Sequence, residues 1–334
     1  MPNDPAPAPG AALARPATIR VATSRSASEP LAITTLPSRA LRGDEVRVRV
    51  RAIGVNPVDW KMREGGPIRL LYRLLGPSGP LVFGVDFAGE VIEVGPAGGP
   101  LAVGARVVGG TNFARNQRGS YASEVIVRPD QCAVLPDEID FARAACLPVP
   151  AVTPWMALTE HRTTGPGSKV LVLGASGGVG LCAIQLARML GATAVGVCST
   201  RNVALVERLG AIAVDYTKGD ALAAARPHGP YDLVLHAVGT ATYPLDGCRA
   251  LLAPGGHVDL VVVRGADYLS IALRRDVRTV LGRPTRARLE PLVAALARGD
   301  LEVIVEERYP LAEAERAHER SRGGKVVGKL VLEP

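Results

Sequence analysis

Two patterns of apolar and polar residues divide the chain. Up to about residue 135, short segments alternate apolar with polar residues, as in EVRVRVRAIGV (45–55) and SYASEVIVRP (120–129). Alternation with a period of two is typical of strands that bury one face. Several such strands, separated by turns that contain glycine, predict a β-barrel or a β-sandwich.

From about residue 150, apolar strands alternate with helices. KVLVLG (169–174) is continuously apolar, GVGLCAIQLARMLG (178–191) is typical of a helix, and AVGVCS (194–199) is the next strand. Strands without polar positions are covered on both faces, which indicates a parallel sheet between helices. EVIVEERY (302–309) and VVGKLVL (326–332) alternate again, so we expect them to return to the first domain.

The length fits two domains, since 334 residues correspond to ~150 residues for each. We predict that the Pro/Ala-rich residues 1–16 are a disordered tail. Residues 17–150 and 285–334 are expected to form a catalytic and substrate-binding barrel domain. Residues 151–284 are expected to form a nucleotide-binding domain.

The charge pattern argues against a nucleic-acid partner. The net charge is +7, but the 34 Arg and 5 Lys residues are scattered among acidic residues, and aromatic residues make up only 4%. A nucleic-acid surface would show clustered basic residues. A small anionic ligand benefits equally from this positive field.

Two further features predict a cytoplasmic protein without membrane insertion. Residues 170–187 lack charge, but four glycines and Gln185 within them favour a strand, a turn and a buried helix over a membrane span. The five cysteines contain no Cys-x-x-Cys pair, which is typical of a reducing compartment.

The clearest motif is GASGGVG at 174–180, which lies directly between a predicted strand and a predicted helix. Pyrophosphate binds backbone N–H groups at close range, where side chains would obstruct it, and a helix N-terminus adds positive potential. The motif therefore predicts a dinucleotide site. The alternative is a glycine turn that only permits tight packing. The small residues of the GASGGVG motif are Gly174, Ala175, Ser176, Gly177, Gly178 and Gly180.

The end of the second strand of this domain favours NADP(H) over NAD(H). An NAD site carries Asp or Glu at this point to bind the ribose diol. This chain has Cys198-Ser-Thr-Arg201 instead, with no acidic residue before Glu207. Ser199 and Arg201 can hydrogen-bond and neutralise a 2′-phosphate. The alternative is that Arg201 is a surface residue at the start of a helix.

A resemblance to one enzyme family spans nearly everything after the tail. It rests on VNPVDWKMREG (55–65), FGVDFAGEVIEVG (83–95), LPVPAVTPWMAL (147–158), LVLGASGGVG (171–180), LLAPGGHVDL (251–260) and VVGKLVLEP (326–334). These segments resemble the zinc-independent branch of the medium-chain dehydrogenase/reductase superfamily, the quinone oxidoreductase (zeta-crystallin-like) proteins. The resemblance implies an α/β fold: a GroES-like β-barrel domain, a Rossmann domain with a doubly wound parallel sheet, and an NADPH-binding cleft between them.

We expect no metal site. Zinc-dependent relatives hold zinc with Cys and His side chains, because the ion prefers sulfur and nitrogen donors. In the matching segments this chain has Asn56-Pro57, Val85 and Val149, and residues 111–120 contain no cysteine. The histidines His161, His228, His257 and His318 show no mutual spacing typical of a ligand set.

The resemblance also implies roles for single residues. Asn56 and Thr153 are expected beside the nicotinamide and its ribose. Gly177, Gly178 and Val179 are expected to hold the pyrophosphate. The remaining expected contacts are Ser199, Arg201 and Tyr216 at the adenosine phosphate, with Val238 and Gly239 at the nicotinamide end.

The proton donor has three candidates, each with an alternative. Asp59 follows Asn56 at a spacing that reaches the cleft, but an acid that caps a turn is equally expected there. Lys61 could neutralise an enolate oxygen, although a solvated surface charge is the favoured interpretation. Tyr72 could donate, but relatives carry a Tyr closer to the Asn-Pro motif, where this chain has Gly65-Gly66.

We therefore expect an NADPH-dependent reductase of quinones or α,β-unsaturated carbonyls, acting on an apolar unsaturated small molecule without a metal. The Arg, Ala, Pro and Gly usage is typical of GC-rich bacterial coding, which points to a biosynthetic pathway. The alternatives are a carbonyl/alcohol oxidoreductase and a catalytically idle, crystallin-like NADPH-binding protein. The resemblance also implies a homodimer joined through Val277–Val280.

Overall fold

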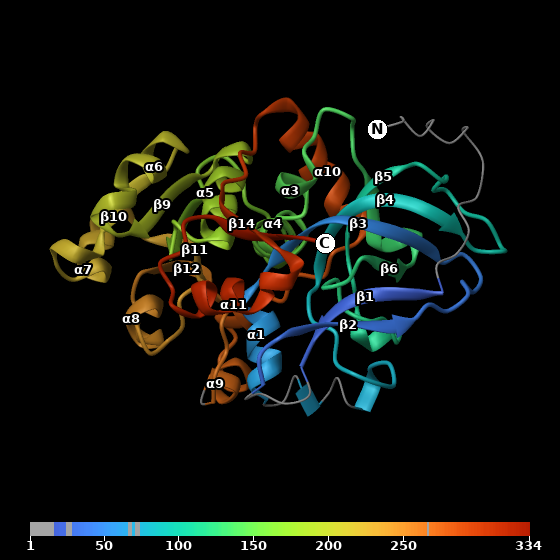
Figure 1. Ribbon diagram of the computed structural model, residues 1–334. Helices are drawn as coiled ribbons and strands as arrows, with labels where there is room; N and C mark the ends of the chain where they lie inside the picture. Colours follow the sequence, from blue (N-terminus) through green and yellow to red (C-terminus); the bar gives the residue numbers. More distant parts are fainter. Residues whose placement is uncertain (1–16, 25–28, 66–68, 71–73, 266) are drawn as a thin grey trace.

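The computed structural model describes residues 17–24, 29–65, 69–70, 74–265 and 267–334. The predicted tail at 1–16 and the candidate donor Tyr72 lie outside these residues. The described chain forms two sheets with their helices and one separate strand pair, and its two halves lie next to each other (Figure 1).

The first sheet is mostly antiparallel and contains strands from both ends of the chain. Its order is β14-β15-β3-β4-β5-β7, and β6 pairs with β3. The last two strands pair in parallel with each other, and β15 then pairs with β3, so the C-terminal segment returns to the N-terminal domain as expected. A separate antiparallel pair is formed by β1 and β2. The bounds are β1 Thr18–Thr23, β2 Ala32–Pro37, β3 Val46–Val55, β4 Asp86–Val94, β5 Arg106–Gly110, β6 Glu124–Val127, β7 Cys132–Val134, β14 Val305–Pro310 and β15 Lys329–Glu333.

The second sheet has six strands in the order β10-β9-β8-β11-β12-β13, and every neighbouring pair is parallel. The chain starts in the middle and winds out to both edges, which is the doubly wound arrangement. The predicted fold class is confirmed. The bounds are β8 Lys169–Leu173, β9 Thr193–Cys198, β10 Ile212–Asp215, β11 Tyr231–His236, β12 Leu252–Leu260 and β13 Val277–Thr279.

Helices cover the sheets and connect the two halves. The α-helices are α1 Pro57–Glu64, α3 Phe141–Ala144, α4 Pro148–Met156, α5 Gly178–Met189, α6 Val203–Arg208, α7 Ala221–Ala225, α8 Leu245–Arg249, α9 Asp267–Leu273, α10 Arg286–Arg298 and α11 Ala314–Arg322. Short 3-10 or π turns are η1 Phe113–Arg115, η2 Pro129–Gln131, η3 Ala157–His161, η4 Thr200–Asn202, η5 Tyr216–Lys218, η6 Arg226–His228 and η7 Leu311–Glu313. Helix α1 packs against α11, which brings the segment after β3 against the C-terminal segment.

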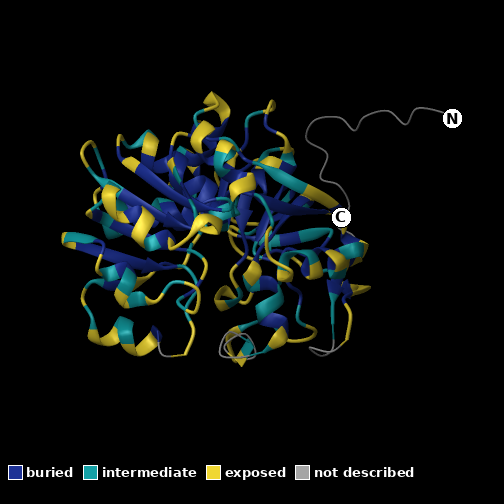
Figure 2. Ribbon diagram, turned by 90° about the vertical axis from the view of Figure 1, so that its left-hand side faces the viewer, coloured by how far each residue is buried: buried dark blue, intermediate teal, exposed yellow. Residues whose placement is uncertain are grey.

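One hydrophobic cluster continues from the first sheet into the second. It includes Ala88 and Val108 of the barrel strands together with Leu181 and Ile184 of α5. Figure 2 shows the sheets as the buried centre, with exposed residues in the outer helices and loops. All five cysteines are free and buried. No helix among the described residues is long and apolar enough to span a membrane.

Candidate active site

The predicted glycine turn forms a tight connection from β8 to α5, here called the glycine elbow (residues 174–180). Gly174 has φ +90°, a conformation that favours glycine. A Cβ at Gly180 would lie 2.2 Å from the carbonyl oxygen of Gly174, so only glycine lets the helix start this close to the strand. A Cβ at Gly177 would meet only that oxygen, at 3.6 Å. The described protein atoms therefore leave space at the Cβ position of Gly177, which we call the open face of the elbow.

Helix α5 directs its N-terminus at this open face. Gly177 is its N-cap residue, and the helix continues for 12 residues. The first N–H groups of a helix have no acceptor within it and carry positive potential. The elbow thus fits the pyrophosphate of a dinucleotide by shape and by charge.

The C-terminal strand packs directly against the elbow. The N–H of Gly328 donates to the carbonyl of Ser176 at 3.0 Å, and Gly328 pairs with Gly177 in a parallel bridge. A Cβ at Gly178 would lie 2.5 Å from Cδ of Lys329. Gly178 is therefore needed to let the Lys329 side chain pass.

That side chain crosses from the elbow to the barrel domain. The ammonium of Lys329 donates to Oδ1 of Asn56 at 2.8 Å and also to the carbonyl of Val55. Nδ2 of Asn56 donates to Oδ2 of Asp86 at 2.8 Å and to the carbonyl of Gly54 at 3.3 Å. We call Lys329, Asn56 and Asp86 the Lys329 junction; all three are buried. Both amide hydrogens of Asn56 are used within the protein, so its side chain acts here as a connector.

The positions that matched zinc ligands in sequence come together at Asp86. Asn56 bonds one oxygen of Asp86, Val85 is its neighbour in the chain, and the N–H of Val149 donates to the other oxygen at 3.0 Å. The three positions offer an amide and two aliphatic side chains. None of these is a sulfur or imidazole donor, so the residues do not fit a zinc ion at this place.

Asp59 lies beneath the junction and caps helix α1. Its Oδ2 accepts the N–H of Asn56 at 2.8 Å and the hydroxyl of Tyr121 at 3.2 Å. Nε2 of His318 lies 3.0 Å from the same hydroxyl. Burial raises the pKa of Asp59 to about 7 and lowers that of His318 to about 4. The geometry supports the capping alternative for Asp59, and its catalytic role stays a prediction.

The free energy of unfolding of Asp59→Asn, relative to that of the wild-type protein, is expected to increase as the pH rises. Burial raises the pKa of Asp59 from 3.8 to about 7, so between these values the folded protein keeps a proton that the unfolded chain loses. The free energy of unfolding of the wild-type protein therefore falls as the pH rises through this window, whereas an amide does not titrate. Urea unfolding across the window measures the difference.

Asp137→Asn is the matched control, because the side chain of Asp137 is 99% exposed. The difference in unfolding free energy between Asp137→Asn and the wild-type protein should stay constant over the same pH range. If the difference for Asp59→Asn were equally independent of pH, the buried carboxyl would not have the raised pKa.

The predicted adenosine-phosphate residues follow neighbouring strands. Ser199 and Arg201 come after β9, and Tyr216 comes after β10, which pairs with β9. The guanidinium of Arg201 donates to the carbonyl of Lys325 at 2.6 Å, which leaves further N–H donors for a ligand. Asp215 also lies beside these residues and was not predicted from the sequence. Its carboxylate accepts a hydrogen bond from the hydroxyl of Thr200 at 2.7 Å. Asp215 is the last residue of β10, whereas the acidic residue of an NAD site is expected at the end of β9.

Val238 and Gly239, two of the residues predicted at the nicotinamide end, lie around the ends of β8 and β11, and Thr153 lies in α4. A Cβ at Gly174 would lie 2.7 Å from Val238, so Val238 covers the start of the elbow. Gly239 has φ +98°, and its N–H donates to Nδ1 of His236 at 3.3 Å. The hydroxyl of Thr153 donates to the carbonyl of Val149 at 2.7 Å, one turn back in α4.

Lys61 is half-buried on α1. Its ammonium lies 5.5 Å from the ring centroid of Trp60. Burial lowers its pKa, and the positive charge of Arg264, which follows β12, lowers it further. Arg264 therefore lies near enough for its charge to act on Lys61. Its role as a proton donor stays a prediction.

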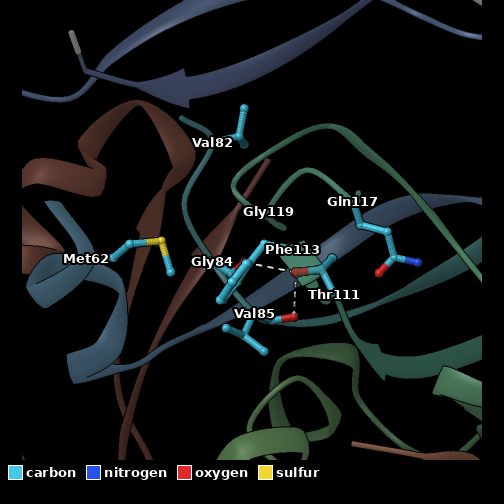
Figure 3. A pocket seen from close by; sticks show the side chains of 8 residues that line it. All are labelled: Met62, Val82, Gly84, Val85, Thr111, Phe113, Gln117 and Gly119. Carbon is cyan, nitrogen blue, oxygen red and sulfur yellow. Dashed lines mark hydrogen bonds between the residues drawn. The ribbon is translucent and has the colours of Figure 1, made fainter. Parts of the chain in front are cut away.

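A small pocket opens beside Val85 (Figure 3). Met62 projects toward it from α1, and Thr111 stands in its centre with its hydroxyl bonded to the carbonyl of Gly84 at 3.0 Å. Among the residues that the structure describes, no ionisable side chain lines this pocket, which suits an uncharged molecule. Its lining residues are Met62, Val82, Gly84, Val85, Thr111, Phe113, Gln117 and Gly119.

Two family models match the chain. Residues 42–137 match the alcohol dehydrogenase GroES-like domain, and residues 209–332 match the model described as zinc-binding dehydrogenase.

Similar proteins cover nearly the whole chain. The chloroplast envelope quinone oxidoreductase homolog of Arabidopsis thaliana is 30% identical over 313 residues, which cover 90% of this chain and 92% of that protein. The trans-enoyl reductase pgmF of Aspergillus terreus is 29% identical over 322 residues and 86% of each chain. The solved structure of the quinone oxidoreductase from Coxiella burnetii has a TM-score of 0.83 at 28% identity and covers 95% of this chain and 98% of that one.

Proposed function

Because the chain belongs to the medium-chain dehydrogenase/reductase superfamily, we propose that it is a metal-independent, NADPH-dependent reductase of a quinone or an α,β-unsaturated carbonyl. The observation that carries the proposal is the arrangement of the Lys329 junction. It joins a glycine elbow with an open outer face to a barrel-domain site whose side chains cannot bind zinc.

The chain's own residues fit the coenzyme along the ends of the parallel strands. Gly177, Gly178 and Val179 hold the pyrophosphate at the N-terminus of α5, and Ser199 and Arg201 bind the 2′-phosphate. Tyr216, 46% exposed, lies against the adenosine, while Thr153, Val238 and Gly239 border the nicotinamide end. When bound, NADPH supplies the hydride.

The substrate is an acceptor that is already electron-poor. A site without a Lewis acid favours a quinone or a conjugated C=C bond over an unactivated ketone. The small pocket beside Val85 offers an uncharged surface to part of such a molecule. Since no ionisable group among the described residues lines this pocket, solvent water supplies the proton that completes the reduction. The quinone oxidoreductase and enoyl reductase relatives support this substrate class.

The test is NADPH oxidation by EDTA-treated protein against a quinone, an enone and a simple ketone. Turnover with the quinone or the enone supports the proposal. Turnover with the ketone alone would instead indicate a carbonyl reductase. Tight NADPH binding with no turnover on any of them would indicate an idle coenzyme-binding protein.

Arg201→Glu is expected to weaken NADPH binding by ~10- to 100-fold and to leave NADH binding little changed. The substitution replaces a cation that pairs with the 2′-phosphate by an anion that repels it, and charge-assisted bonds are worth ~1.5–3 kcal/mol. Fluorescence titration with both coenzymes measures the change. Arg20→Glu is the control, because Arg20 is an exposed arginine on β1, outside the parallel sheet. Equal losses for both coenzymes would contradict the role of Arg201.

We further infer a homodimer through the edge of the parallel sheet. Among the described residues, β13 pairs with β12 and has no strand on its other side. Leu273 and Leu281 lie on either side of β13 in the chain and are 73% and 65% exposed. A second copy would cover this edge and these side chains.

A further inference from the structure

A cluster of two imidazoles and one carboxylate lies on one face of the parallel sheet. His257 and Asp259 are separated by one residue of β12, so both side chains point to the same face. His161 ends the turn η3, which follows α4 and brings its ring to Asp259. Nδ1 of His161 lies 2.9 Å from Oδ2 of Asp259, and Nε2 of His257 lies 3.5 Å from Oδ1.

Two polar atoms of this cluster have no hydrogen-bond partner among the described residues. They are Nε2 of His257 and Oδ1 of Asp259. The side chains of these residues are 3% and 0% exposed, so protein closes them off from solvent. Leaving buried polar atoms unpaired is costly, and such atoms in a native structure call for a ligand or an ion.

The carboxylate is suited to carry its charge here. Oδ2 of Asp259 bonds with the imidazole of His161, and Oδ1 faces the imidazole of His257. The cluster therefore combines one anionic oxygen donor with two imidazole nitrogens. This donor set is one that Zn²⁺ and related divalent transition metals prefer.

We propose that His161, His257 and Asp259 bind a divalent transition-metal ion, with Zn²⁺ as the expected occupant. Their ligand atoms all lie within 4.8 Å of one another. Tetrahedral zinc holds its ligand atoms ~3.3 Å apart, so small side-chain rotations close the site. The side chain of His161 is 23% exposed, which gives the ion a way in and leaves room for a water as fourth ligand.

A plain His–Asp hydrogen bond explains only part of this geometry. It satisfies Nδ1 of His161 but not Nε2 of His257 or Oδ1 of Asp259. A metal ion satisfies all three residues and releases the proton of Nδ1 to solvent. The neighbouring Glu160 is held by Arg288 at 2.6 and 2.7 Å, so it is not needed as a ligand.

This site is separate from the coenzyme site. None of its residues belongs to the glycine elbow or the Lys329 junction, and none stands at the positions that matched the ligands of zinc-dependent relatives. The ion would join η3 to β12 and thereby hold the end of α4 on the sheet. Its role is structural, and its binding stabilises the folded state by mass action.

The test is a Co²⁺ titration of the chelator-treated full-length protein, followed by displacement with Zn²⁺. We expect one Co²⁺ per chain, a visible absorption band of a four-coordinate site without a thiolate charge-transfer band, and a Tm that rises with Zn²⁺. His161→Gln and His257→Gln should each weaken binding at least ~10-fold. His228→Gln, a substitution of a histidine in η6, should leave it unchanged.

Since the wild-type titration needs no variant, it can overturn the proposal by itself. No Co²⁺ uptake at micromolar metal would do so, and so would a thiolate band. Binding that survives both substitutions would also overturn it, because the metal would then lie elsewhere. NADPH binding by each variant shows whether it is folded.

Discussion

Lys329→Met is expected to lower the free energy of unfolding by roughly 3–5 kcal/mol, because it removes one partner of a buried charge network. Methionine keeps most of the aliphatic chain that packs on Gly178. It cannot donate to Asn56 or Val55, and it takes the positive charge away from Asp86. Urea unfolding of both proteins measures the loss.

The loss should depend on pH. Burial raises the pKa of Asp86 to about 7, and the charge of Lys329 is the main interaction that opposes this rise. Above pH 7 the variant must therefore bury a carboxylate without its cation, or keep that carboxyl protonated. Well below pH 7 the carboxyl is neutral in both proteins, so the difference in stability should shrink.

Lys218→Met is the matched control. The side chain of Lys218 is 75% exposed and lies 3.9 Å from Asp215, a surface pair that contributes little. Its unfolding free energy should stay within ~0.5 kcal/mol of the wild-type value. A loss of this small size for Lys329→Met would show that the Lys329 junction does not stabilise the folded protein.

Local patterns in the sequence were sufficient to predict the parallel sheet and the glycine elbow. Continuous apolar segments predicted the strands that became β8 and β9, and the glycine turn between strand and helix predicted the start of α5. These features depend on residues that are close in the chain, where strand and helix periodicities act directly. The return of β14 and β15 to the first sheet was also visible, as renewed alternation.

The Lys329 junction could not be predicted in this way. Lys329 and Asn56 are 273 positions apart, and only the fold brings them together. In sequence, a lysine in VVGKLVL resembles an outward-facing strand residue. A signal was nevertheless present, because Asp86 and Lys329 are each a charged residue at the start of a strand that continues with apolar residues, and a buried charge needs a partner.

The histidines show the same limit. The absence of regular spacing among His161, His228, His257 and His318 predicted no ligand set. In the structure His161 and His257 meet at Asp259, a proximity that their spacing along the chain did not indicate. His161 follows α4, whereas His257 and Asp259 are in β12, so no local period links them. Only the folded sheet brings these side chains together.

Gly177→Ala is expected to abolish most coenzyme binding without harming the fold. Gly177 has φ −80°, which alanine adopts readily, and the added Cβ meets only the carbonyl oxygen of Gly174, at an ordinary 3.6 Å. The methyl group projects from the open face of the elbow, where the pyrophosphate has to approach the N–H groups. Loss of these bonds, at ~2 kcal/mol, weakens binding by ~30-fold.

The most direct measurement is a calorimetric titration of NADPH into the wild-type protein, Gly177→Ala and Gly165→Ala, each with its Tm. Gly165 has open space where a Cβ would lie and is outside the elbow, so it controls for the loss of a glycine. We predict equal Tm values, tight binding by the wild-type protein and Gly165→Ala, and ~30-fold weaker binding by Gly177→Ala. Unchanged NADPH binding by a folded Gly177→Ala protein, or no binding by the wild-type protein, would contradict a coenzyme site at the glycine elbow.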